Sequence, residues 1–347
     1  MRRLSLITFL ALLPVILHAQ RGGENVYSFL KLTNAARVSA LGGMNVSIND
    51  DDLNLVFHNP ALLTAGMDRN MNLNYVNYFA GVNYGYASYA LEREGLGNFA
   101  GGIHYVDYGT FSGTDEYGNA QGTFRASEYA LNLVYSRSLI DSVLSVGVNV
   151  KPIFSIYERY TSLGLTADIG ALYTLCATNT SVGVVLKNMG LQITSFSGTR
   201  EKVPFEIQAG ISQALEHAPF RFNIQFQHLE RWDLTYEKAG TPDLFGGETE
   251  VTNRFDQFAD NFMRHAIFGV ELLLGENLHF DLGYNYKRRQ EMKMDSWPGM
   301  VGFSWGFGFR VAKFHVAYGR STYHLAGGTN HFSLTTNLSE FYRKGKG

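Results

Sequence analysis

The sequence is poor in cysteine, with Cys176 alone, and in proline, with seven residues. One cysteine cannot form an intramolecular disulfide, so no covalent bridge stabilises this chain. Beyond the first twenty positions there is no apolar run of about 20 residues, which excludes a hydrophobic helix long enough to span a membrane in that part of the chain. The formal net charge of -2 provides no basic surface for nucleic acid.

Alternation of large apolar with small or polar residues is what the sequence has in abundance, together with 37 Gly, 25 Phe and 20 Tyr. Between positions 278 and 287, large apolar side chains occupy every second position, with residues such as His279 and Asp281 between them. The same pattern recurs between 302 and 310. A period of two predicts β-strands, and aromatic residues crowded on one face are typical of strands with lipid outside and a polar lumen inside.

Fourteen segments show this pattern, most of them about 9 to 11 residues long, which suits a tilted span across an outer membrane. The predicted strands are 71–79, 82–91, 99–107, 127–137, 143–155, 163–175, 180–188, 204–214, 220–230, 265–274, 278–287, 301–311, 313–321 and 331–341.

Connection lengths are expected to alternate. They are short after the fourth, sixth, eighth, tenth and twelfth strands, and long through 115–125, 189–202, 231–264 and 288–299. Two connections depart from this parity: the first is very short, and 92–98 is longer than a tight turn. Short turns at one end and long loops at the other are typical of outer-membrane barrels. The sequence therefore predicts an all-β fold, a transmembrane outer-membrane β-barrel of about 14 antiparallel strands with an N-terminal lumenal plug.

The N-terminus has the features of a secretory signal. Arg2 and Arg3 precede an apolar run over 4–17, and a cleavage site is expected near Ala19. Export by this signal would bring the chain to the outer membrane of a Gram-negative bacterium. No linker of biased composition divides the rest. The predicted organisation is a signal peptide at 1–19, a plug at 20–70, a barrel at 71–341 and a basic tail at 342–347.

The segment before the first strand carries three short motifs. A glycine pair permits a turn with positive φ, three aspartates can cap a short helix, and Asn-Pro is expected to end that helix. Because the segment contains no spanning strand, we expect it to fold inside the lumen. A calcium site at the aspartates is the less favoured alternative, since the spacing of known calcium loops is absent. The motif residues are Gly42, Gly43, Asp50, Asp51, Asp52, Asn59 and Pro60.

In this order, the motifs resemble the N-terminal region of the long-chain fatty-acid transporter (FadL) superfamily of outer-membrane barrels. Within it, the lead-in at 27–32, the compact length and the sequence Asn-Pro-Ala-Leu-Leu at 59–63 are most similar to the PorV and PorQ group of type IX secretion proteins. The resemblance implies a non-enzymatic component that helps to tether or receive the complex attaching secreted proteins to the cell surface. The implied partners are other surface-attachment proteins, with lipopolysaccharide as a further candidate, in outer-membrane lipid.

Two other functions stay open. The first is passive transport of long-chain fatty acids or other small hydrophobic molecules, as in the fatty-acid branch of the superfamily. The second, an outer-membrane hydrolase, finds little support because no His-Glu-x-x-His or Gly-x-Ser-x-Gly motif occurs. Lumen lining is favoured over a metal site or catalytic dyad, so we predict no catalytic residue, metal or cofactor. The residues expected to line the lumen are His279, His315, His331, Glu128 and Asp281.

The longest predicted loop contains an apolar stripe. Phe255, Phe258 and Phe262 recur at i, i+3 and i+7, which predicts a short amphipathic helix. With Trp232 and Tyr236 they form a candidate partner surface. The alternative is that the helix only packs over the mouth of the barrel.

Overall fold

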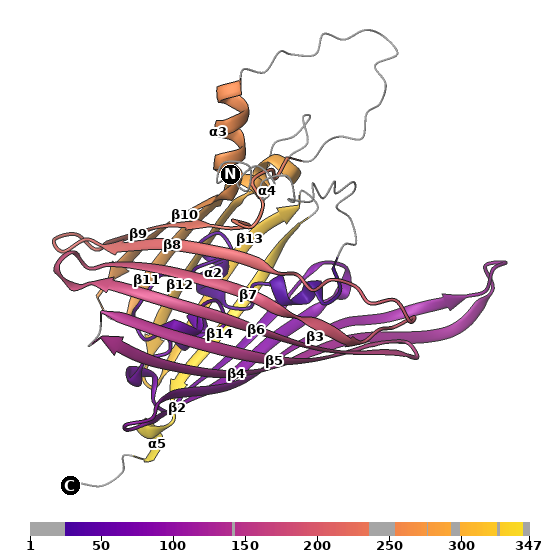
Figure 1. Ribbon diagram of the computed structural model, residues 1–347, viewed down its shortest axis with the longest axis horizontal. Helices are drawn as coiled ribbons and strands as arrows, with labels where there is room; N and C mark the ends of the chain where they lie inside the picture. The colour runs from indigo at the N-terminus through magenta and orange to yellow at the C-terminus, as the bar shows by residue number, and fades with distance from the viewer. Residues whose placement is uncertain are drawn as a thin grey trace, which may run out of the picture.

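Fourteen antiparallel strands close into a single barrel, in which each strand pairs with its neighbours in chain order and β1 pairs with β14 (Figure 1). The computed structural model describes residues 25–140, 143–235, 254–275, 277–292, 299–324 and 327–342. The predicted fourteen-stranded antiparallel barrel is confirmed. The predicted signal peptide, residues 343–347 of the tail and Tyr236 lie outside the described residues.

The strands match the fourteen predicted segments one for one. They are β1 (Asn70–Asn77), β2 (Asn83–Arg93), β3 (Gly97–Thr114), β4 (Ala120–Ile140), β5 (Leu144–Tyr157), β6 (Tyr160–Leu175), β7 (Thr180–Thr194), β8 (Glu206–Ala214), β9 (Phe220–Phe226), β10 (Ala266–Leu274), β11 (Leu278–Asn285), β12 (Phe303–Val311), β13 (Phe314–His324) and β14 (Gly327–Asn337). The helices are η1 (Ser28–Lys31), α2 (Ala36–Ala40), η2 (Leu53–Leu55), η3 (Pro60–Leu62), η4 (Ala65–Met67), η5 (Phe79–Gly81), η6 (Cys176–Thr178), α3 (Arg254–His265), α4 (Tyr286–Met292) and α5 (Ser339–Tyr342).

The alternation of side chains has the predicted orientation. Outward-facing Leu73, Ile103 and Leu282 are 51%, 52% and 63% exposed, whereas inward-facing Asn132 and Gln225 are fully buried. Several of the buried polar groups bond to one another, as where Asn149 donates to Asn132 Oδ1 at 2.9 Å. An apolar exterior around a polar interior is the pattern of a barrel that sits in lipid.

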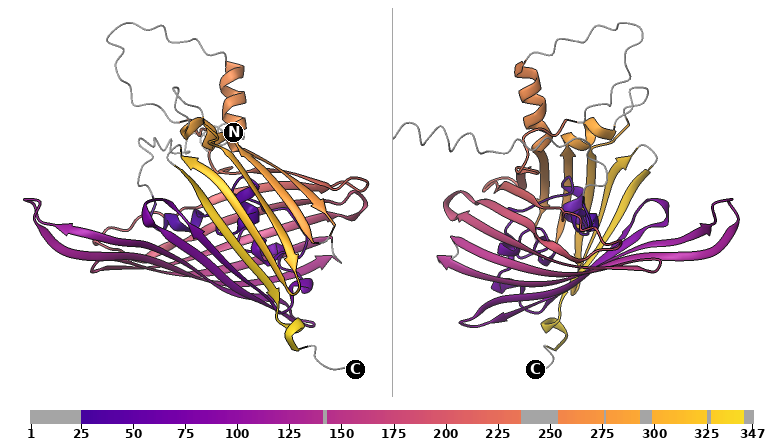
Figure 2. Two further views of the ribbon diagram at one scale, coloured as in Figure 1. Left: turned by 180° about the vertical axis from the view of Figure 1, so that it is seen from behind. Right: turned by 45° about the vertical axis from the view of Figure 1, so that its right-hand side comes forward.

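Two predicted connections are wrong. The long loop at 115–125 does not exist, because β3 and β4 continue as a paired ribbon that projects beyond the barrel (Figures 1 and 2). Its Phe111 and Phe124 rings stack at 5.2 Å, and Asp115 accepts hydrogen bonds from the backbone of the turn. The long joint predicted at 92–98 is a tight hairpin, since β2 and β3 pair as far as Arg93 and Gly97.

Strand ends also differ from the prediction. Tyr286 starts α4 instead of continuing its strand, and the last strand ends at Asn337 rather than at 341, where α5 follows. The connections after β9 and β11 contain α3 and α4, and the end of the barrel that carries these two helices is here called the long-loop end. The opposite end, near α5, is called the short-turn end.

Residues 25–69, here called the inner segment, lie inside the barrel (Figure 2). Their hydroxyl groups bond to strands on different sides of the wall: Ser39 to Ser321 at 2.6 Å on β13, Ser47 to Ser212 at 2.6 Å on β8, and Tyr27 to Ser162 at 2.6 Å on β6. A small apolar core within the segment is buried against Leu172. Polar contacts to the wall and apolar contacts within the segment together fill the lumen.

None of the helices in the described residues is both long and apolar enough to cross a membrane.

Candidate functional site

The glycine pair of the motif turns the chain directly after α2. Gly42 and Gly43 have φ of 101° and 100°, and the Gly43 N–H donates to Val38 O at 2.9 Å. The turn presses on the wall, because a Cβ added at Gly283 of β11 would lie 2.2 Å from Gly42 N. Glycines on both sides of this contact allow the two backbones to approach closely.

The three aspartates have three different roles, and the expectation that they cap a helix together holds only for Asp52. Asp52 accepts from Asn54 N at 3.0 Å at the start of η2. Asp51 has a φ of 60° and accepts a hydrogen bond from Thr64 Oγ1. Asp50 forms ion pairs with two arginines.

The prediction that Asn59-Pro60 ends a helix is wrong, because the pair begins one. Asn59 accepts from Ala61 N at 3.0 Å as the cap of η3, and Pro60 occupies the first helical position. Proline suits that position because its missing N–H has no helical partner there. Asn59 Nδ2 also donates to Val46 O at 2.8 Å, which closes the inner segment on itself.

An ionic cluster joins the inner segment to the wall. Arg37 lies 2.6 Å from Asp50, 3.1 Å from Asp52 and 2.7 Å from Glu271 on β10. Arg221 on β9 lies 2.6 Å from Asp50 and 3.0 Å from Glu271. We call Arg37, Asp50, Asp52, Arg221 and Glu271 the Arg37 cluster. Sequence reasoning singled out the two aspartates and missed the role of the other three. The only signal for Arg221 and Glu271 is charge at lumen-facing strand positions, and Arg37 lies in α2 of the inner segment.

The electrostatics of this cluster favour the charged forms of Arg37 and Asp50. Burial alone would lower the pKa of Arg37, but Asp50, Glu271 and Asp52 raise it well above its usual value. Burial would likewise raise the pKa of Asp50, but Arg37 and Arg221 bring it below its usual value. Arg37 and Asp50 are therefore charged at neutral pH, and their ion pairs with Glu271 and Arg221 of the wall fasten the inner segment.

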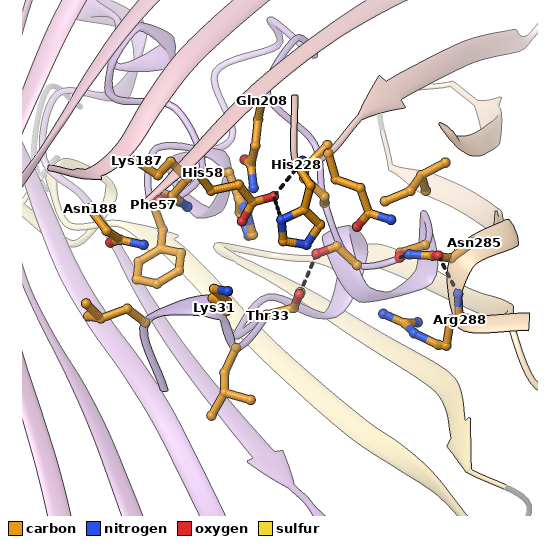
Figure 3. Close-up of a pocket in the computed structure, with 18 residues that line it drawn as sticks. Lys31, Thr33, Phe57, His58, Lys187, Asn188, Gln208, His228, Asn285 and Arg288 are labelled. Atoms are coloured by element: carbon orange, nitrogen blue, oxygen red, sulfur yellow. Dashed lines mark hydrogen bonds and ion pairs between the residues drawn. The ribbon is translucent and has the colours of Figure 1, made fainter. Parts of the chain in front are cut away.

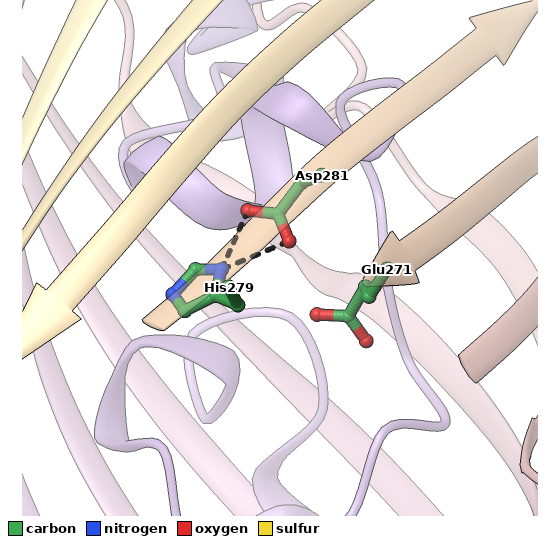
Figure 4. Close-up of side chains that lie close together, drawn as sticks. All are labelled: Glu271, His279 and Asp281. Carbon is green, nitrogen blue, oxygen red and sulfur yellow. Dashed lines mark hydrogen bonds and ion pairs between the residues drawn. The ribbon is translucent and has the colours of Figure 1, made fainter. Parts of the chain in front are cut away.

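Glu271 of the Arg37 cluster lies close to two further ionisable side chains, His279 and Asp281 (Figure 4). Glu271, His279 and Asp281 have possible ligand atoms within 4.8 Å of one another, and His279 Nδ1 lies 2.9 Å from Asp281. Both Glu271 oxygens accept hydrogen bonds from arginine side chains. These guanidinium groups supply the positive charge that a metal ion would otherwise bring to Glu271. The geometry thus describes a buried charge network rather than an open metal site.

The histidines and carboxylates predicted to line the lumen are found there. His279 and His315 stack with ring centroids 5.4 Å apart, while His331 bonds to Thr329 at 3.0 Å. Glu128 accepts from Ser155 at 2.7 Å and from Tyr108 at 2.5 Å. These partners account for the side chains as lumen filling.

The inner segment separates two cavities. At the short-turn end, a cavity of about 500 Å³ is lined by Arg37, Asp50, Arg221 and basic residues of β12 and β13. Toward the long-loop end, a cavity of about 150 Å³ lies between the inner segment and strands that include β7 and β8 (Figure 3). The Arg37 cluster borders the first of these cavities.

The predicted amphipathic helix is confirmed as α3, which stands away from the barrel mouth (Figure 1). At its base, Phe262 lies 5.9 Å from Phe226, and Phe258 lies 5.1 Å from Trp232, measured between ring centroids. Phe255, Phe258 and Trp232 remain 71%, 55% and 52% exposed. The helix thus contacts the barrel mouth at its base, and the first part of its apolar stripe is exposed.

No protein-family model and no curated protein matches the chain. Among solved structures, the chain is similar to the Pseudomonas putida toluene transporter TodX, with 11% identity, 88% of this chain and 96% of that chain covered, and a TM-score of 0.48. It is similar to a Pseudomonas aeruginosa FadL homologue, with 11% identity, coverage of 88% and 98%, and a TM-score of 0.49. Values this low do not show a shared family or function. Neither of these two proteins is named as a component of type IX secretion.

Proposed function

We propose that this chain is an outer-membrane barrel, closed by its inner segment, that acts as a non-enzymatic docking component of the type IX protein secretion system. The structural observation that carries the docking role is the exposed apolar stripe of α3 beyond the long-loop end. The link to secretion comes from the resemblance of the lead-in at 27–32, the compact length and the sequence Asn-Pro-Ala-Leu-Leu at 59–63. In this proposal the short-turn end faces the periplasm, as in outer-membrane barrels generally.

The filled lumen supports docking over conduction. Hydrogen bonds from the inner segment reach strands as far apart as β6, β8 and β13. The Arg37 cluster adds ion pairs to β9 and β10. A barrel held closed by contacts on several sides is suited to present a surface rather than to pass large molecules.

The surface of α3 has the composition of a partner interface. Aromatic side chains form its centre, and Arg254, Asp256, Asp260 and Arg264 surround them. Exposed aromatic residues with a charged rim are typical of protein docking sites. A protein of the surface-attachment complex with a matching apolar groove is the partner that we propose.

The direct test compares a strain that lacks this chain with its parent. We expect proteins carrying type IX sorting signals to be lost from the cell surface, to accumulate in the periplasm, or to be released unanchored. Fractionation and immunoblotting of surface, periplasm and medium measure the three pools. Normal anchoring in the deletion strain would contradict the proposed function.

Substituting Phe258→Asp should abolish docking without unfolding the barrel. The new carboxylate would place a charge at the centre of the apolar stripe, and we expect partner binding to weaken by about 10-fold or more. Pull-down from detergent extracts measures binding, and heat-modifiable migration on gels reports the folded barrel. The matched control is Gln257→Asp, which adds the same charge one residue away, and equal binding by the two variants would exclude the stripe as the interface.

A second candidate is passive transport of small hydrophobic molecules. The observation in its favour is the group of apolar residues in the cavity toward the long-loop end. The residues are Leu30, Leu32, Met44, Phe57 and Ile267. Uptake of a labelled fatty acid that falls in the deletion strain while anchoring stays normal would favour transport over docking.

A further inference from the structure

The cavity toward the long-loop end contains a buried lysine that lacks a carboxylate partner among the described residues. Lys187 on β7 is only 5% exposed. Its Nζ lies 3.4 Å from Phe57 O and 5.1 Å from the centroid of the Phe57 ring. A buried ammonium is costly unless it is paired, and these two contacts compensate it weakly.

The carboxylate nearest along the sheet is engaged elsewhere. Glu206 lies directly across the strand pair from Lys187. Its Oε1 accepts from the backbone N–H of His228 at 3.3 Å and lies 3.7 Å from His228 Nδ1. Lys187 is therefore left facing the cavity.

Two further side chains at this cavity each have a buried polar atom with no hydrogen-bond partner in the part of the chain that the structure describes. His58 is 4% exposed and Gln208 is 7% exposed, and neither His58 Nε2 nor Gln208 Oε1 is bonded. Burial, with Lys187 and His104 nearby, lowers the pKa of His58 well below its usual value. A neutral imidazole can carry its proton on Nε2, and the amide of Gln208 can turn its NH₂ inward, so both can donate.

The formal charge of the lining is positive. Among the described residues around the cavity, Lys31, Lys187 and Arg288 are cationic and Glu206 is the single carboxylate. Such an excess of positive charge around unbonded polar groups favours an anion.

We propose that this cavity binds a compact oxyanion, a free carboxylate or phosphate, held by Lys187 and hydrogen-bonded by His58 and Gln208. The cavity volume of about 150 Å³ suits a group of a few heavy atoms rather than a long chain. A neighbouring space of about 270 Å³ at the mouth shares Gln227, Asn285 and Arg288 with it. This shared lining places the two spaces next to each other. The site does not depend on the secretion role.

The test is calorimetric titration of the full-length protein in detergent micelles at neutral pH. The probes are inorganic phosphate, acetate and decanoate, each compared with chloride at equal ionic strength. We expect saturable binding of phosphate or acetate, weakened by about 10-fold or more in Lys187→Met, because one charge-assisted contact is lost. His58→Leu is a second variant that should also weaken binding, which keeps the test valid if one variant folds poorly.

The matched control is Lys313→Met, which removes the same charge at the short-turn end. Lys313 donates to Glu340 O at 2.6 Å and lines the other cavity, so anion binding should stay at the wild-type level. Absence of saturable phosphate and acetate binding, or equal binding by wild type and Lys187→Met, would overturn the proposal. Binding of decanoate alone would also overturn it, and would support an amphiphile headgroup and the transport function.

Discussion

Replacing Arg37 with alanine is expected to release the inner segment and to lower the free energy of unfolding by about 3–5 kcal/mol. Arg37 is the link between Asp50 and Asp52 of the inner segment and Glu271 of the wall. Glu271 is fully buried, so removal of one of its two guanidinium partners leaves a buried charge undercompensated. Urea unfolding measures the loss of stability, and conductance in planar bilayers measures opening of the lumen.

Two comparisons separate this effect from a general loss of charge. Arg69→Ala removes an exposed partner of Asp68, 3.4 Å away, and should change stability by no more than about 0.5 kcal/mol. The double substitution Arg37→Met with Glu271→Met removes one charge of each sign. It should lower the free energy of unfolding by less than Arg37→Ala does. If Arg37→Ala stays closed and as stable as the wild type, the Arg37 cluster does not fasten the inner segment.

Gly183→Ala should displace the inner segment by steric contact alone. A Cβ at Gly183 of β7 would lie 1.9 Å from Val46 O, a backbone atom that also accepts from Asn59. Since neither backbone can yield easily, we expect a cost of about 1–3 kcal/mol or more and an open or leaky lumen. Thermal unfolding followed by heat-modifiable migration, together with bilayer conductance, measures both effects.

Gly101→Ala is the matched control for this substitution. Gly101 faces outward from β3, and a Cβ there would meet nothing within 4 Å. Its stability and conductance should equal those of the wild type. A Gly183→Ala protein that behaves like Gly101→Ala would show that the inner segment does not press on the wall at this position.

Prediction from sequence succeeded where the signal is local. The period of two identified all fourteen strands and their outward faces, because side chains alternate across a strand whatever its neighbours. The spacing of Phe255, Phe258 and Phe262 identified α3 for the same reason at helical period. Prediction from sequence failed for the ribbon of β3 and β4. This ribbon extends beyond the part of the barrel that faces lipid, and a strand there is not required to alternate apolar and polar residues.

By itself, the sequence determined the strand number, the polar lumen and the amphipathic helix, because each follows from periodicities within about ten residues. Only the tertiary structure decided the partners of the inner segment. Arg37 and Glu271 are 234 positions apart, and nothing in their surroundings indicates that they meet. Lys187 and His58 likewise come together only when the segment enters the barrel. Contacts between distant parts of a chain depend on how the closed sheet surrounds the inner segment, which no local pattern encodes.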